Sequence, residues 1–193
     1  SCGFADELLE ALHAHGARNL TLVANNPEVS ERGMVLLLRD QRISKLVCSY
    51  SRLEGTALIE DLVEDGMELE IIPQGTLAER VRCAGAGIPG FYTRTGVGTP
   101  LALGKEHRDF DGDTFIFEPA LRADFAFVRA RRGDRWGNLV YDKSARNFNP
   151  VMAIGGARTI AQVDEIVGLG ELDPEAIITQ GIFVQHVVET REP

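Results

Sequence analysis

The residues best suited to chemistry gather in one stretch of the chain, residues 73–99. Gln74 follows an apolar run from Met67 to Ile72 and precedes a short helical pattern. A side-chain amide at a strand-to-helix junction can donate a hydrogen bond to an oxygen that gains negative charge, as in an oxyanion hole. A glutamine that only caps a turn would give the same pattern, so both interpretations of Gln74 stay open.

Glycines flank this amide on both sides of the helical pattern. Gly75 follows Gln74 directly, and Gly85, Gly87 and Gly90 end the pattern. Glycine lets a backbone N–H approach a ligand closely, at an entropic cost that a purely structural loop seldom carries. We therefore expect a binding edge here, although a glycine turn that only ends a helix is the structural alternative.

Residues 85–90 also spell the dinucleotide-binding pattern G-x-G-x-x-G. That fingerprint requires a strand before the glycines and a helix after them. Here a helical pattern comes first, and Pro89 would obstruct the start of a following helix. The sequence therefore disfavours a nicotinamide site.

Asn25 and Asn26 end the first strand-like run and are candidates for a second amide donor. Asparagine before proline is also a common turn former. The tripeptide Glu64-Asp65-Gly66 lies between a helical pattern and a strand-like run, and we interpret it as a solvated turn. His13, His15, His107 and His186 show no metal-ligand or catalytic-triad spacing, so no metal site is predicted.

Composition excludes several classes of function. The net charge is −9, whereas binding to a phosphate backbone needs clustered Lys and Arg, so nucleic acid is not an expected partner. No apolar run approaches the roughly 18 residues of a membrane span, and no signal peptide is visible. The three cysteines, Cys2, Cys48 and Cys83, have no C-x-x-C spacing and are expected to be free thiols in a cytoplasmic protein.

The elements that must position these residues alternate between strand and helix in the first half. Helical patterns at 5–15, 33–39, 56–64 and 76–84 separate strand-like runs at 20–24, 43–49 and 68–72. The second half is richer in strands, predicted at 107–118 (a hairpin around Asp111-Gly112), 123–129, 140–141, 152–154 and 182–188. We expect one α/β domain over residues 1–193, with an open, mainly parallel sheet flanked by helices and a β-rich insertion.

Several ordered blocks resemble the alpha (A) subunit of the family I CoA-transferases, of the 3-oxoacid and 3-oxoadipate type. They lie at residues 73–80, 85–93, 133–139, 144–150, 170–174 and 181–185, and the resemblance runs from about Ala5 to Val188. It implies the fold of that family, which several sugar-phosphate isomerases share.

The resemblance also implies a function. The alpha subunit would work in a heteromeric enzyme that moves CoA from succinyl-CoA, or a similar donor, to a 3-oxoacid. Gln74, with Asn26 as a further candidate, would support the oxyanion, while Asn25, Gly75, the Gly85–Gly90 loop and Phe91 would bind the substrate. The covalent glutamate would come from the beta (B) subunit, in a heterodimer or heterotetramer. No cofactor would be needed, because the CoA thioester is itself a substrate.

The sequence leaves other substrates and other functions open. The enzyme could prefer 3-oxoadipate, or acetate and butyrate, as its acid. More remote are a sugar-phosphate isomerase, which would need an internal carboxylate base, and a non-catalytic module that senses acyl-CoA or another metabolite. Family members usually carry a strand and a Gly-Gly-Phe loop before the first helix. Here only Ser1-Cys2-Gly3-Phe4 precedes it, so either that unit is missing from this sequence or the protein has lost it.

Overall fold

The computed structural model describes residues 3–27, 31–51 and 57–190. Its first half is a parallel sheet with the strand order β1-β2-β3. The strands are β1 (Leu20–Val23), β2 (Ile43–Cys48) and β3 (Glu68–Ile71). The helices that precede and connect them are α1 (Asp6–His15), α2 (Met34–Arg39) and α3 (Leu58–Glu64). Crossover helices are what parallel strands require, so the predicted alternation of strands and helices is confirmed here.

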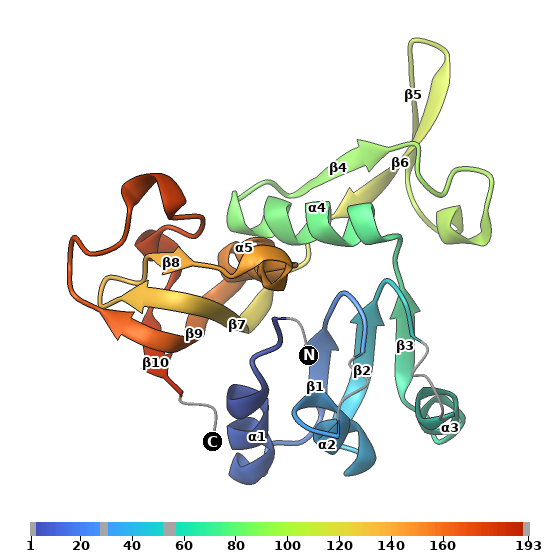
Figure 1. Cartoon of the computed structure of the whole chain (residues 1–193). Helices are drawn as coiled ribbons and strands as arrows, with labels where there is room; N and C mark the ends of the chain where they lie inside the picture. The colour runs from blue at the N-terminus through green and yellow to red at the C-terminus, as the bar shows by residue number, and fades with distance from the viewer. Residues whose placement is uncertain (1–2, 28–30, 52–56, 191–193) are drawn as a thin grey trace.

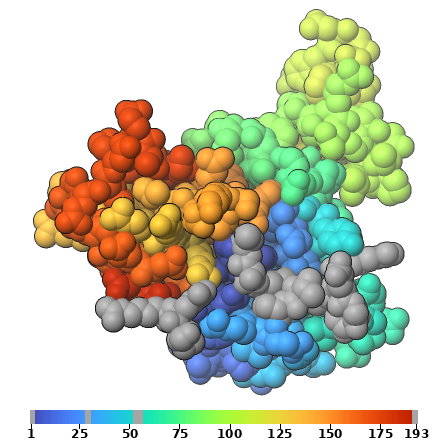
Figure 2. All heavy atoms as spheres, in the orientation of Figure 1, coloured from blue at the N-terminus to red at the C-terminus, as the bar shows by residue number. Residues whose placement is uncertain are grey.

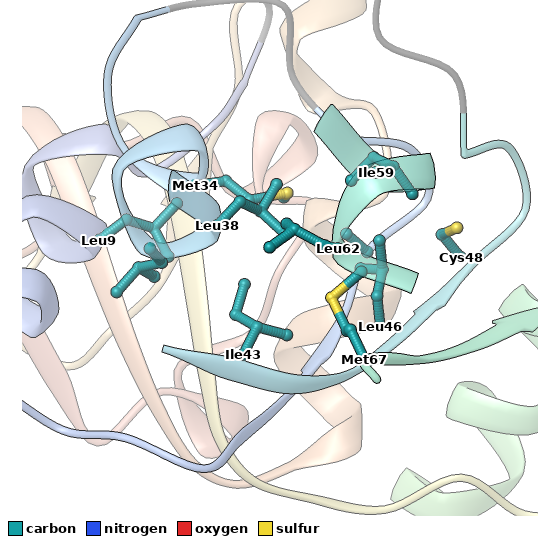
Figure 3. Packing of buried hydrophobic residues seen from close by; sticks show 11 residues of the cluster. Leu9, Met34, Leu38, Ile43, Leu46, Cys48, Ile59, Leu62 and Met67 are labelled. Carbon is teal, nitrogen blue, oxygen red and sulfur yellow. The ribbon is translucent and has the colours of Figure 1, made fainter. Parts of the chain in front are cut away.

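The helices cover this sheet through an apolar core, which Figure 3 shows. Leu38 on α2 and Leu46 on β2 are fully buried, and Ile59 of α3 is 1% exposed. The helix α1 contributes Leu9 from its apolar stripe and ends at Gly16, whose φ of 85° suits glycine. Burial of these side chains fixes the strands of the sheet, and with them the loops at the carboxyl ends of the strands.

After β3 the chain enters α4 (Gln74–Gly85), which lies beyond the carboxyl ends of β1, β2 and β3 (Figure 1). A three-stranded antiparallel sheet follows, in the order β4-β6-β5. Its strands are β4 (Gly90–Thr93), β5 (His107–Phe110) and β6 (Asp113–Pro119). Asp111 and Gly112 both have positive φ, as a tight hairpin turn requires, so the predicted hairpin is confirmed. This sheet stands out from the rest of the molecule (Figure 2).

The remaining strands form a four-stranded sheet in the order β10-β9-β7-β8. Its elements, with the helix between β8 and β9, are β7 (Ala123–Asp134), β8 (Leu139–Val140), α5 (Asn149–Gly155), β9 (Gly156–Val167) and β10 (His186–Glu189). The long strands β7 and β9 are parallel, β10 runs parallel to β9, and only β8 is antiparallel. Short 3-10 turns occupy Pro100–Ala102, Lys143–Arg146, Pro174–Ala176 and Gly181–Phe183.

The α/β class, the mainly parallel pairing and the β-rich insertion are therefore confirmed, although the strands lie in three sheets instead of one. The strand predicted at 152–154 is wrong, because these residues belong to α5, where Pro150 occupies the first turn. The strand predicted at 182–188 begins only at His186. Two strands, β4 and β9, were not predicted. Three apolar residues in a row fit a helix as well as a strand, so pattern alone could not decide residues 152–154.

Within the described residues, none of the helices combines the length and the apolarity that crossing a bilayer requires. The expected single domain and the strand that the resemblance implies ahead of residue 1 stay predictions.

Candidate active site

Three polar side chains meet at the carboxyl edge of the parallel sheet. Asn25 follows β1, Ser49 follows β2, and Gln74 opens α4 shortly after β3. The carboxyl ends of parallel strands share one edge, so residues far apart in sequence come together there (Figure 1). This edge is the usual ligand-binding side of an open α/β sheet.

The amides of this edge form one hydrogen-bonded chain. The Gln74 Nε2 donates to Asn25 Oδ1 at 2.9 Å. The Asn25 Nδ2 donates to Asn26 Oδ1 at 3.2 Å, and Asn26 Nδ2 donates to the Pro27 carbonyl at 3.2 Å. The fold thus brings together Gln74, Asn25 and Asn26, as expected from the sequence. Each carboxamide carries two N–H groups, so each amide retains one that these contacts do not use.

The start of α4 adds backbone donors to the same place. Gln74 is the first residue of this helix, and Pro73 before it provides no side-chain cap. The first N–H groups of a helix lack partners within the helix and carry a partial positive charge. Gln74 and Gly75 are both exposed, and a Cβ atom added to Gly75 would meet no atom within 4 Å. An anionic oxygen could therefore approach the backbone here.

An apolar cavity of about 490 Å³ lies beside these amides, between β1 and the start of β7. Asn25 and Asn26 line one part of it, with Leu22, Phe127 and Met152 among the apolar lining residues. Among the described residues, Gln74, Gly75 and the glycines of the 85–90 loop do not line it. β1 is one of the two edge strands of its sheet, and the cavity borders it.

The glycine loop is separated from Gln74 by the length of α4. Eleven residues at about 1.5 Å each place Gly85 about 16 Å from Gln74 along the helix. A Cβ on Gly85 would lie 2.2 Å from the Ile154 carbonyl oxygen, and one on Gly90 would lie 2.4 Å from the Phe117 ring. Close packing within the protein therefore accounts for these two glycines. A role of Gly85, Gly87, Gly90 and Phe91 in substrate binding stays a prediction.

The same segment has the wrong neighbours for a dinucleotide site. The helix α4 precedes Gly85–Gly90 and the strand β4 follows, which reverses the order that the fingerprint needs. The sequence-based argument against a nicotinamide site therefore holds in the structure.

Glu64, Asp65 and Cys48 do not place a reactive nucleophile beside these amides. Glu64 is the last residue of α3 and Asp65 follows it in the turn before β3; both are exposed, at the opposite end of this strand from Gln74. The Cys48 side chain, next to Ser49, belongs to the apolar core, and burial raises the pKa of this thiol, which keeps it protonated. No cluster of His, Cys, Asp or Glu in residues 3–27, 31–51 and 57–190 could hold a metal ion.

Ser49 belongs to this site, although it was not predicted from the sequence. Its hydroxyl lies 2.8 Å from Asn25 Oδ1 and 2.7 Å from the Asn25 carbonyl oxygen. The available signal was its position, since Ser49 comes just after the end of a strand, as Asn25 does. A serine at a strand end is too common to single out without knowledge of its neighbours.

The arrangement places neutral hydrogen-bond donors where they could stabilise a developing oxyanion, next to an apolar cavity.

Solved proteins with this fold include CoA-transferases. The acyl-CoA transferase YdiF from E. coli O157:H7 has a TM-score of 0.81 and 23% identity, over 96% of this chain and 40% of that chain. Glutaconate coenzyme A-transferase from Acidaminococcus fermentans has a TM-score of 0.81 and 18% identity, over 97% of this chain and 66% of that chain. The fold is thus the one found in CoA-transferases.

The amino-acid sequence defines the family more narrowly. Residues 1–190 match the coenzyme A transferase family. The chain is 51% identical over 189 residues to the alpha (A) subunit of 3-oxoadipate CoA-transferase of Pseudomonas putida, which covers 97% of this chain and 82% of that protein. It is 45% identical over 192 residues to the corresponding subunit of succinyl-CoA:3-ketoacid coenzyme A transferase of Xanthomonas campestris pv. campestris, which covers 100% of this chain and 79% of that protein. The chain belongs to the coenzyme A transferase family.

Proposed function

We propose that this chain is the alpha subunit of a heteromeric CoA-transferase that moves CoA from succinyl-CoA, or a similar donor, to a 3-oxoacid. The observation that carries this proposal is the Gln74–Asn25 amide pair at the start of α4, in a chain of this family. The names of the relatives support both the reaction and the division of the enzyme into two kinds of chain.

The chemistry follows from the amides. A carboxylate nucleophile attacks the thioester carbonyl, the carbonyl oxygen becomes negative, and the C–S bond then breaks to release the CoA thiolate. Gln74 and the backbone N–H groups at the start of α4 donate hydrogen bonds to that oxygen, with Asn25 and Asn26 as further donors. Because the amides are neutral and preorganised, they stabilise the tetrahedral state without needing a proton transfer.

The nucleophile comes from the partner in this proposal. A glutamate of the beta subunit forms first an acyl-glutamyl anhydride and then a glutamyl-CoA thioester, from which the second acid takes the CoA. In this chain, Glu64 lies at the opposite end of β3 from Gln74, which supports a carboxylate supplied by the partner. The assembly is a heterodimer or heterotetramer in the cytoplasm, with CoA thioesters and carboxylic acids as substrates and no cofactor.

The test is a transferase assay with succinyl-CoA and a panel of 3-oxoacids, on this chain alone and with a candidate beta subunit. We expect activity only in the mixture. Equal activity of the chain alone would contradict the need for a partner's glutamate. A mixture that forms a complex but transfers no CoA to any acid would contradict the proposed reaction.

A second acid is favoured by a specific observation. Two relatives, at 51% and 49% identity, are named as subunits of 3-oxoadipate CoA-transferase. 3-Oxoadipate is itself a 3-oxoacid with a second carboxylate, so the same amides would serve it. Including 3-oxoadipate in the panel, beside a monocarboxylic 3-oxoacid, decides between the two by their kcat/KM values.

A further inference from the structure

We propose that Ser49 is a positioning residue, which holds the Asn25 carboxamide, and through it Gln74, in the orientation that the transfer reaction needs. This inference rests on the proposed function for its catalytic meaning, although the orientation itself can be measured independently.

Ser49 contacts Asn25 in two different ways. Its backbone N–H donates to the Asn25 carbonyl oxygen at 2.8 Å, which ties the end of β2 to the end of β1. Its hydroxyl lies 2.7 Å from the same carbonyl oxygen and 2.8 Å from Asn25 Oδ1, so one proton is shared between two acceptors. The backbone contact holds the two strand ends, and the hydroxyl reaches the side chain of Asn25.

The hydroxyl and Gln74 together hold the Asn25 carboxamide at its oxygen. Asn25 Oδ1 accepts from both Ser49 Oγ and Gln74 Nε2, so its oxygen is turned toward these two donors. Its Nδ2 therefore faces Asn26 Oδ1. With the carboxamide reversed, Asn25 Nδ2 would face Gln74 Nε2, donor against donor, and the contact would be lost.

This orientation decides where the second N–H of Gln74 points. While one N–H of Nε2 is held by Asn25 Oδ1, the other is directed away from Asn25 and remains for a ligand oxygen. An oxyanion hole works because its donors are fixed before the reaction. Ser49 contributes by restricting the motion of the Asn25 carboxamide, without touching the substrate.

Ser49→Ala tests the hydroxyl alone, because the backbone N–H contact to Asn25 survives this substitution. Ser44→Ala is the matched control, since Ser44 lies on β2, the strand that Ser49 follows, and its hydroxyl contacts the Leu20 carbonyl at the other end of β1. The first measurement is the NMR signal of the Gln74 side-chain amide in the isolated ¹⁵N-labelled chain. We expect Ser49→Ala to shift or broaden this signal, and Ser44→Ala and Ser49→Thr to leave it nearly unchanged.

The second measurement is steady-state transfer by the complex with the beta subunit. The loss of one hydrogen bond predicts that Ser49→Ala lowers kcat roughly three- to tenfold with little change in the KM for acyl-CoA. In a chain that already carries Gln74→Ala, the same substitution is expected to have almost no further effect, because the two residues act through one carboxamide. Ser49→Thr should retain most of the activity.

An unchanged Gln74 amide signal in Ser49→Ala would overturn the inference, and so would independent, multiplying effects of Ser49→Ala and Gln74→Ala on kcat. An inactive wild-type complex would overturn the proposed function instead, and the amide signal would still decide whether Ser49 orients Gln74.

Discussion

Gln74 Nε2 and Asn25 Oδ1 are joined by a hydrogen bond of 2.9 Å, although the residues are 49 positions apart in the chain. The bond crosses from the end of the first strand to the start of the fourth helix, and it gathers two amides at one edge of the sheet. Both groups stay uncharged over the whole range of pH in which the protein is folded. The site is therefore built to stabilise charge on a ligand and has no acid or base of its own among these amides.

Removal of the Gln74 amide is expected to slow the chemistry and spare the fold. Gln74 is exposed, and loss of one oxyanion donor typically lowers kcat about 10²- to 10³-fold. We expect Gln74→Ala to reduce the rate of thioester formation in the assembled enzyme by that order, with an unchanged melting temperature. Gln41→Ala is the control, since Gln41 is a surface amide that contacts Asp65. Wild-type turnover in Gln74→Ala would remove this residue from the mechanism.

Two glycine substitutions on one helix separate a binding role from a packing role. Gly75→Ala meets no atom within 4 Å, so we expect the folded protein to keep its stability and, if a ligand approaches this backbone, to show a higher KM for acyl-CoA. Gly85→Ala places its methyl group 2.2 Å from the Ile154 carbonyl oxygen and should lower the melting temperature by separating α4 from α5. Thermal unfolding and steady-state kinetics on both variants give the comparison. Unaltered kinetics in Gly75→Ala would argue against close ligand approach at this residue.

Arg80 on α4 is expected to be a major contributor to stability. Its guanidinium Nε donates to the Pro119 carbonyl at 2.8 Å, and its Nη1 lies 3.0 Å from Glu70 Oε1 and 3.9 Å from the buried Glu118 carboxylate. Without Arg80, the Glu118 carboxylate keeps Lys105 and the Glu70 carboxylate keeps Lys45, but the Pro119 carbonyl and both carboxylates each lose a donor, so Arg80→Leu should cost about 1–3 kcal/mol in the free energy of unfolding.

Arg82 provides the control for Arg80 on the same helix. It forms an exposed i,i+3 pair with Glu79, and such pairs contribute about 0.5 kcal/mol or less. Chemical denaturation of both variants should show the contrast. Equal destabilisation by Arg80→Leu and Arg82→Leu would mean that the buried network does not hold α4 to the antiparallel sheet.

Alkaline pH should lower the free energy of unfolding through the ionisation of Tyr141. Burial raises the pKa of this phenol to about 12, while its hydrogen bond to Thr179 acts in the opposite direction. The unfolded phenol ionises near its ordinary value of 10, so the folded state loses stability as pH rises from about 10 to 12. Two pKa units correspond to about 3 kcal/mol.

Denaturation curves between pH 8 and 12 measure this effect. Tyr141→Phe should lose about 1 kcal/mol at neutral pH, for the hydrogen bond to Thr179, and should show a flatter decline above pH 10. The same alkaline decline in Tyr141→Phe and in the wild-type protein would assign the effect to other groups.

Much of the fold could be predicted from the sequence because its signals are local. The spacing of Leu8, Leu9 and Leu12 marks α1, and Asp111-Gly112 marks the hairpin turn. Strands β4 and β9 carried weaker signals. β4 directly follows the glycine-rich turn after α4. β9 follows α5 without a connecting loop, so no turn residue marks the start of β9.

For the candidate site too, some residues could be predicted from the sequence and others only from the structure. The types of the residues, an amide after an apolar run and asparagines at a strand end, marked Gln74, Asn25 and Asn26 as candidates, because each signal lies within a few residues of its strand. The family resemblance favoured a functional role over a turn-capping one. Nothing in the sequence set Ser49 apart from other serines. The glycine-rich pattern also grouped the Gly85–Gly90 loop with Gln74, whereas the structure places them at opposite ends of α4.

What the sequence determined by itself was therefore the α/β pattern, the family resemblance and the chemical character of the site. The tertiary structure alone decided which of these residues meet. Propensity and periodicity act over a few residues, but contact across the sheet edge depends on how β1, β2 and β3 align, and burial of the core between them and their helices sets that alignment. The Asn25–Ser49–Gln74 contacts are consequences of that packing.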